Sequence, residues 1–75
     1  MQPTLSNRFG HVVRALRQES GLSQVVFAER CGFYQTYLSR IETGKTNPML
    51  NAIEIISEAL GISVFDLFDQ IRDCR

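Results

Sequence analysis

Cysteine, histidine, tryptophan and proline are scarce in this chain of 75 residues. It holds two cysteines, one histidine, two prolines and no tryptophan. No CxxC or HxxxH spacing occurs, so we expect no zinc or other metal site and no cofactor. The two cysteines make no disulfide framework: we expect Cys31 to be a buried thiol, while Cys74 stands one residue before the end.

Long hydrophobic runs are also missing. No apolar stretch approaches the roughly 20 residues that span a membrane, and residues 1–4 lack the basic and apolar regions of a signal peptide. We therefore expect a cytoplasmic protein. Catalysis needs a tuned acid–base pair or an activated nucleophile in a pocket. A chain this short, with His11 as its single histidine, is not expected to be an enzyme.

Net charge is absent as well, but the two signs of charge are separated along the chain. Residues 1–48 carry six basic and three acidic side chains, whereas residues 49–75 carry two basic and five acidic ones. The first part is thus suited to face phosphate while the second points away from it. Chance partition in a short chain is the alternative.

What is present is a helical pattern of apolar residues, which predicts one all-α domain over residues 1–75. Helices are expected at about residues 7–20, 24–31, 35–43, 49–60 and 64–71, with Ser23 and Ser63 as caps. The inner stripe of the fourth helix is expected to be Leu50, Ile53, Ile56 and Leu60. So small a domain is marginally stable alone, and dimerisation would stabilise it.

Residues 24–43 have the spacing of a helix-turn-helix. Ala28 stands where two helices would cross, and its small side chain allows their backbones to approach. Gly32 suits a tight turn because glycine adopts positive φ without strain. Leu38 and Ile41 are spaced to close the two helices over a shared core.

Five further short segments belong to the same pattern, which covers about residues 8–70. They are Gly21-Leu22-Ser23-Gln24, Leu38-Ser39-Arg40-Ile41-Glu42, Gly44-Lys45, Asn47-Pro48 and Ala59-Leu60-Gly61-Ile62-Ser63. In these features the chain resembles the Cro/CI-like (XRE-type) helix-turn-helix regulators. The resemblance implies a compact five-helix domain that dimerises and binds a two-fold operator in double-stranded DNA. The short length and helical ending are also similar to restriction–modification controller proteins.

The outer face of the third predicted helix carries the candidate base readers Gln35, Thr36, Ser39 and Arg40. Gln35 is the first choice, because a glutamine amide can bond N6 and N7 of adenine together. Thr36 can offer a methyl group to thymine, and Ser39 can bond a base or the backbone. For Arg40, contact with a guanine and contact with a phosphate are both candidate roles.

Candidate phosphate contacts are Gln24, Tyr37, Lys45, Thr46 and Asn47. Gln24 begins a helix, where backbone N–H groups and the helix dipole favour an anion. The resemblance also implies that Gln24 braces Gln35. Residues 45–47 are expected to form a polar loop after the third predicted helix, which would be the recognition helix. For Tyr37, phosphate contact and packing are both candidate roles.

The resemblance further implies an ion pair of Arg17 with Glu42, joining the first helix to the end of the third. Two unrelated surface charges are the alternative. The chain departs from the family pattern at Val25 and Val26, where acidic residues are common, and at Tyr34, where a capping residue is usual. The two valines expose apolar surface suited to a sugar or a thymine methyl group.

Ile55, Phe65 and Ile71 are expected to form an exposed apolar patch, interpreted as an isologous dimer surface over helices in residues 49–71. The alternative is a rotated fifth helix that buries Phe65. The predicted function is a homodimeric, sequence-specific transcriptional regulator that reads a pseudo-palindrome. An antitoxin or other protein-interaction module is the second interpretation. RNA polymerase or a cognate toxin or inhibitor is a further candidate partner.

Overall fold

The structure, a computed structural model, describes residues 3–73, which form five helices and no strand. The helices are α1 (Leu5–Glu19), α2 (Gln24–Cys31), α3 (Gln35–Glu42), α4 (Leu50–Leu60) and α5 (Val64–Arg72). The predicted all-α, five-helix fold is thereby confirmed. Within residues 3–73, no helix combines the length and the apolar character needed to cross a membrane.

The helix starts follow from side-chain caps. Ser23 Oγ accepts a hydrogen bond from the Val26 N–H at 3.2 Å, and Ser63 Oγ accepts one from the Asp66 N–H at 3.0 Å. Helix α1 begins two residues earlier than predicted because Thr4 Oγ1 caps it, a signal the sequence reading overlooked. Tyr34 precedes α3 and makes no side-chain cap, as its departure from the family pattern suggested.

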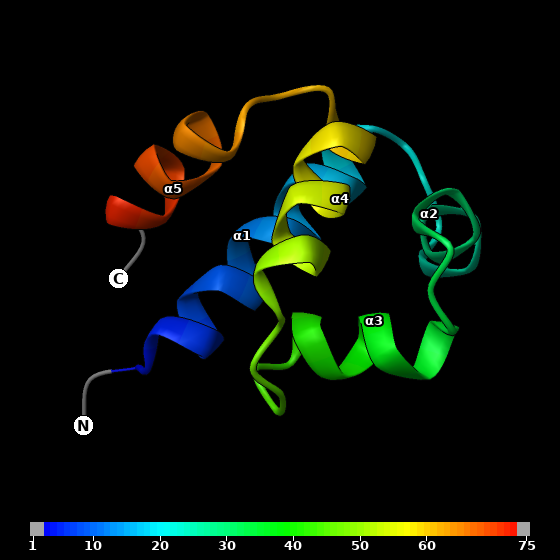
Figure 1. Ribbon diagram of the computed structural model, residues 1–75, viewed down its shortest axis with the longest axis horizontal. Helices are drawn as coiled ribbons and strands as arrows, with labels where there is room; N and C mark the ends of the chain where they lie inside the picture. Colours follow the sequence, from blue (N-terminus) through cyan, green and yellow to red (C-terminus); the bar gives the residue numbers. More distant parts are fainter. Residues whose placement is uncertain (1–2, 74–75) are drawn as a thin grey trace.

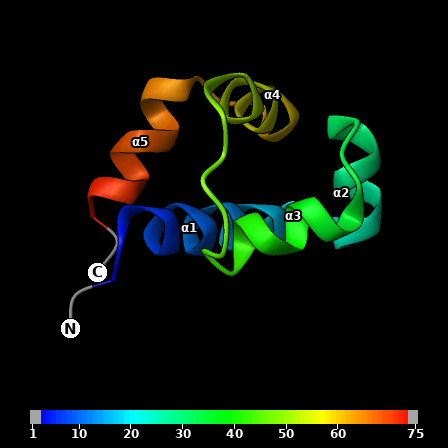
Figure 2. The same ribbon diagram turned by 60° about the horizontal axis from the view of Figure 1, so that its bottom comes forward.

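All five helices contribute to one core around α1 (Figures 1 and 2). Its largest fully buried hydrophobic side chains are Phe27, Leu38, Ile41, Ile56, Leu67 and Val13. The predicted inner stripe of α4 is wrong at Leu50. This residue stands at the first turn of the helix, beyond the core, and is 83% exposed. About 100° per residue places Leu50 some 120° around the helix from Ile56, which explains its exposure.

Helices α1 and α3 approach each other at Gly10, a buried glycine in the middle of α1. A Cβ atom at this position would collide with the carbonyl oxygens of Ile41 and Glu42. Only glycine lets the two backbones lie this close. A glycine inside an otherwise helical pattern is a signal of close packing, so the sequence contained evidence for this contact.

Candidate DNA-binding surface

Helices α2 and α3 are joined by a tight turn that fixes their relative direction. Gly32 ends α2 in the left-handed conformation at φ 73°, and the Phe33 N–H donates to the Ala28 carbonyl at 2.9 Å. Helix α3 then runs along the lower edge of the molecule in Figure 1 and lies at the front in Figure 2. Its outward side carries Gln35, Thr36 and Arg40, which are exposed, and Ser39, which is half-buried.

Behind this face, Arg17 of α1 and Glu42 at the end of α3 form a bidentate ion pair. Arg17 Nε donates to Glu42 Oε2 at 2.7 Å, and Arg17 Nη2 donates to Oε1 at 3.1 Å. Arg17 Nη1 also donates to the Leu22 carbonyl at 2.8 Å. The two side chains are only 9% and 2% exposed, unlike a pair of unrelated surface charges. The contact ties α1, the α1–α2 turn and α3 together.

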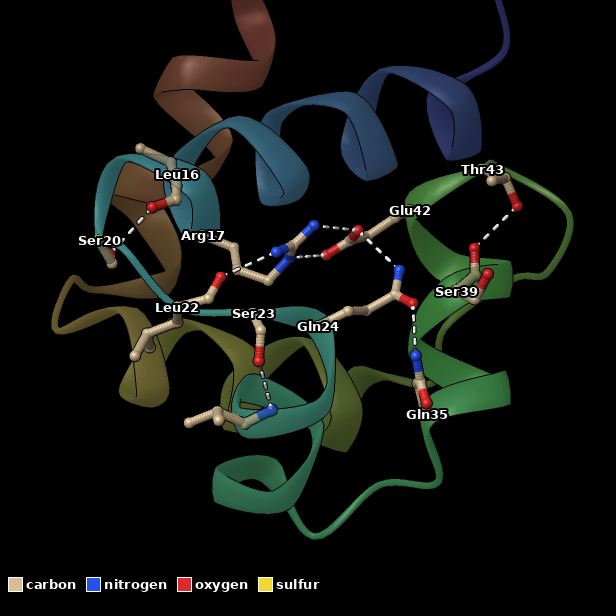
Figure 3. A network of polar contacts seen from close by, with 11 residues as sticks. Leu16, Arg17, Ser20, Leu22, Ser23, Gln24, Gln35, Ser39, Glu42 and Thr43 are labelled. Atoms are coloured by element: carbon tan, nitrogen blue, oxygen red, sulfur yellow. Dashed lines mark hydrogen bonds and ion pairs between the residues drawn. The ribbon is translucent and has the colours of Figure 1, made fainter.

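Gln24 connects this ion pair to the surface of α3 (Figure 3). Its Nε2 donates to Glu42 Oε1 at 3.1 Å, and its Oε1 accepts from Gln35 Nε2 at 3.3 Å. Both ends of the Gln24 amide are therefore engaged within the protein. At the first turn of α2, where N–H groups lack helical partners, Gln24 can bind an anion with its backbone N–H and with the second N–H of its side-chain amide.

Arg40 and the loop after α3 hold each other in place. Arg40 Nη2 donates to the Lys45 carbonyl at 3.1 Å, and the Lys45 N–H donates to the Arg40 carbonyl at 2.8 Å. Further along, Ser6 Oγ donates to Asn47 Oδ1 at 3.0 Å, a contact with α1 that sequence reasoning missed. Lys45 and Asn47 are exposed and Thr46 is half-buried, so the loop presents a positive charge and an amide beside the end of α3.

Tyr37 belongs to the packing between α3 and the turn. Its ring is 5.1 Å from that of Phe33 at an interplanar angle of 81°, and the residue is half-buried against the core. This edge-to-face contact is a favoured aromatic geometry. It favours the packing alternative over the predicted phosphate contact.

Comparison with known proteins identifies the two-helix arrangement. The family described as "Helix-turn-helix domain" matches residues 8–67. The chain belongs to this family. It is a DNA-binding helix-turn-helix transcriptional regulator.

The regulator is similar to several control proteins. Control protein C.MunI from Mycoplasma sp is 45% identical over 66 residues, which cover 87% of this chain and 89% of the relative. Control protein C.BamHI from Bacillus amyloliquefaciens is 45% identical over 62 residues, covering 81% and 76%. The crystal structure of the restriction-modification controller protein C.AhdI from Aeromonas hydrophila superposes with a TM-score of 0.81 at 35% identity, covering 84% of this chain and 96% of that one. The predicted membership and the prediction that the chain is no enzyme are confirmed by these relatives.

The valines that follow Gln24 give the regulator an apolar surface next to its polar face. Val25 is 51% exposed and Val26 is 38% exposed, at the first turn of α2. The charge that acidic side chains would bring to this turn is absent, since the first turn of α2 holds no acidic residue. The predicted apolar contact with sugar or a thymine methyl group remains a prediction.

Large apolar residues of α4, α5 and the position before α4 are exposed, and other residues of α1, α4, α5 and the loop before α4 line a groove. Phe65 is 82% exposed, Leu50 83% and Met49 73%. The groove has a volume of about 130 Å³ and is lined mainly by Leu5, Phe9, Pro48, Ile53 and Phe68. The alternative in which Phe65 is buried in its own core is therefore wrong.

The predicted dimer patch is wrong at Ile71, which is 2% exposed and belongs to the core. It lies four residues after Leu67, on the same inward face of α5. Ile55 is 36% exposed. It stands about 200° around α4 from Ile53, which lines the groove. Ile55 and the groove thus lie on opposite borders of α4.

Cys31 closes α2 against the core, where it is 7% exposed. Burial raises the pKa of its thiol from 9.0 to about 11, which keeps it protonated and unreactive at neutral pH. In the part of the chain that the structure describes, no group of three metal-binding side chains occurs. Cys74 lies outside the described residues.

Proposed function

We propose that this regulator acts as a homodimer on a pseudo-palindromic operator, with one α3 in each of two successive major grooves. The observation that carries the proposal is the exposed Gln35 amide, which Gln24 holds at 3.3 Å on the outer face of α3. Recognition helices of a helix-turn-helix dimer lie about 34 Å apart, one turn of DNA. The operator would thus contain two half-sites related by a two-fold axis.

Base reading is assigned to Gln35, Thr36 and Ser39. Gln35 and Ser39 are one helical turn apart on the exposed face, and Thr36 is adjacent to Gln35. Arg40 is bonded to the Lys45 carbonyl at 3.1 Å. This contact draws its guanidinium toward the loop, which favours phosphate over guanine as its DNA partner.

Phosphate binding is assigned to both ends of the helix pair. The backbone N–H of Gln24 serves one end, at the positive end of the α2 dipole. Lys45 and Asn47, with the half-buried Thr46 between them, serve the other. These contacts bracket α3 and would set its register in the groove without reading sequence.

Dimerisation is assigned to the exposed residues Phe65 and Leu50 together with the groove lined by Phe68. A second copy of the chain would cover these residues and fill the groove. Two-fold DNA requires a two-fold protein surface. Three side chains more than 70% exposed, Met49, Leu50 and Phe65, supply apolar area that only a partner would bury. Ile55 is retained as a second interface candidate on the other border of α4.

The first test is selection of the purified regulator on random duplex DNA, followed by sequencing of the bound pool. Enrichment of a two-fold motif with half-sites about one turn apart is expected. Gln35→Ala should then relax the preference at one base position per half-site and cost about 1–3 kcal/mol. An equal loss of affinity for every sequence would show that Gln35 binds phosphate.

Lys45→Ala is the matched variant for phosphate binding. It should weaken all sequences alike and lower the slope of log K against log salt by about one per protomer. An unchanged slope would remove Lys45 from the interface.

A protein-interaction module, such as an antitoxin, is the second candidate function. The exposure of Phe65 beside the acidic residues Asp66 and Asp69 favours it, because apolar surface with charged surroundings suits a protein partner. Folded protein that enriches no DNA sequence would support this candidate and overturn the operator proposal.

A further inference from the structure

The buried ion pair and the exposed Gln35 amide are the two ends of one continuous chain of hydrogen bonds. Arg17 binds Glu42, Glu42 accepts from Gln24 at 3.1 Å, and Gln24 accepts from Gln35 at 3.3 Å. Figure 3 shows these side chains joined one to the next by dashed lines, from Arg17 on α1 to Gln35 on α3. The buried end of the chain is a carboxylate, and its exposed end is a group assigned to base reading.

The chemistry of the carboxylate fixes the direction of every bond in this chain. Glu42, bonded to Arg17 as a carboxylate, can only accept hydrogen bonds. Gln24 must therefore turn its NH₂ group toward Glu42, which leaves its carbonyl oxygen facing Gln35. Gln35 must in turn present an N–H to that oxygen. Glutamine amides have no such preference by shape, because their oxygen and NH₂ ends are nearly alike in size.

This direction decides what Gln35 offers to DNA. One of its two N–H groups is used by Gln24, so its remaining edge has one donor and one acceptor. Adenine presents the complementary pair in the major groove, with N7 as acceptor and N6 as donor. Guanine presents two acceptors, N7 and O6, and one of them would face the Gln35 carbonyl oxygen.

We propose that Glu42 is a positioning residue for base recognition: through Gln24 it sets the hydrogen-bond direction of the Gln35 amide and so makes α3 prefer adenine to guanine. The inference rests on the proposed reading of base edges by Gln35. It gives the buried pair a role in specificity in addition to holding α1 against α3. Glu42 itself touches no DNA in this scheme.

The Glu42→Gln variant tests the direction of the chain. Its side chain keeps one oxygen, which Arg17 Nε would retain, since the 2.7 Å contact is the shortest in the network. The NH₂ group then faces Gln24 as a donor, so both Gln24 and Gln35 turn over. Gln35 would now direct its carbonyl inward and its free N–H outward.

The measurement is the ratio of affinities for selected operator duplexes that carry adenine or guanine at the position relaxed by Gln35→Ala. The adenine-over-guanine ratio should fall roughly tenfold in Glu42→Gln. Glu58→Gln, which removes the same charge from an exposed position on α4, is the matched control and should keep the wild-type ratio. A purely structural role of Glu42 would weaken both duplexes equally and leave the ratio unchanged, which would overturn the inference.

A second variant covers the case in which Glu42→Gln does not fold. Replacing the pair together, Arg17→Met with Glu42→Leu, keeps apolar volume in the core, a change that buried pairs often tolerate. It removes the directing carboxylate, and the ratio should fall here too. An unchanged ratio in this folded variant would equally contradict the inference.

Side-chain NMR of the free protein provides a readout without DNA. The Gln24 NH₂ protons should exchange with solvent more slowly than those of Gln18, which is exposed on α1, and both Gln24 and Gln35 signals should move in Glu42→Gln but not in Glu58→Gln. Unmoved signals would overturn the inference while leaving the proposed function intact. Wild-type protein that prefers no DNA sequence would overturn the proposed function, and the inference with it.

Discussion

Within residues 3–73, the two halves of this regulator differ in the kind of ion pair that each contains. Arg17 and Glu42 meet at 2.7 Å with side chains 9% and 2% exposed, and they join α1 to α3. Arg72 and Asp69 meet at 2.9 Å with side chains 79% and 61% exposed, within the single helix α5. The half that carries the candidate DNA-binding surface is thus held together by a buried ion pair between two helices.

The half formed by α4 and α5 is held by apolar packing, but some of its large apolar side chains remain exposed. Ile56 and Leu67 are fully buried, while Leu50 and Phe65 are more than 80% exposed. The polar network behind α3 is thus completed within one chain, whereas the apolar side chains of Leu50 and Phe65 stay exposed in the single chain.

Removing one member of each ion pair should produce the largest difference. Glu42→Ala leaves the Arg17 guanidinium buried without its partner and should lower the free energy of unfolding by about 3–5 kcal/mol. Asp69→Ala breaks an exposed pair and should cost at most about 1 kcal/mol. Urea unfolding followed by circular dichroism measures both. Equal losses would remove the contrast between the two halves.

Phe65→Glu tests whether the exposed apolar surface is an interface. A charge in place of a buried phenyl ring should weaken dimerisation by about 2–3 kcal/mol and give a folded monomer that binds the operator poorly. Ile55→Glu, on the other border of α4, separates the two candidate surfaces. Sedimentation of both variants decides the matter: a Phe65→Glu dimer with an Ile55→Glu monomer would move the interface to Ile55.

Gly10→Ala tests how closely α1 and α3 are held together. Alanine normally stabilises a helix by up to about 1 kcal/mol relative to glycine. Here the new methyl group meets the Ile41 and Glu42 carbonyl oxygens, and we expect a net loss of about 1–3 kcal/mol. Thermal unfolding gives the sign of the change, and a stabilised variant would show that the helices can separate without cost.

Cys31 provides a smaller effect within α2. Its thiol pKa is about 11 in the folded protein and near 9.0 when exposed, so the unfolded chain loses its proton first as pH rises. Folding stability contributed by this group is complete below pH 9 and declines between about pH 9 and 11. In a Cys74→Ser background, thiol labelling at pH 8 should be slower for folded than for urea-unfolded protein. Equal rates would contradict the burial of Cys31.

Much of the reading half was predictable because its signals are local. Ala28, Gly32, Leu38 and Ile41 are spaced as two helices and a turn require, and the structure places the three apolar side chains in the core. Resemblance to a family added the Arg17–Glu42 pair, which joins residues 25 positions apart. No local pattern gives such a contact, because it depends on how α1 crosses α3.

The other half was predicted less well. Ile71 was assigned to the surface and lies in the core, while Leu50 was assigned to the core and is exposed. Periodicity gives the relative angles of residues on one helix, but the rotation of that helix against its neighbours sets which angle is buried. For α4, that rotation is decided by packing against α2, α5 and α1, and for α5 by packing against α1 and α4. A change of a few tens of degrees exchanges core and surface.

The helix pair, its turn and the polar face of α3 could be predicted from the sequence alone, because spacing, caps and glycines act within a few residues along the chain. Three contacts depend on how the helices pack: Gln24 engages Glu42 and Gln35 at once, Gly10 lies against two carbonyl groups, and Tyr37 packs on Phe33. The physical reason is that hydrogen bonds and van der Waals contacts depend on ångström distances between separate helices. Those distances arise only when all five helices share one core.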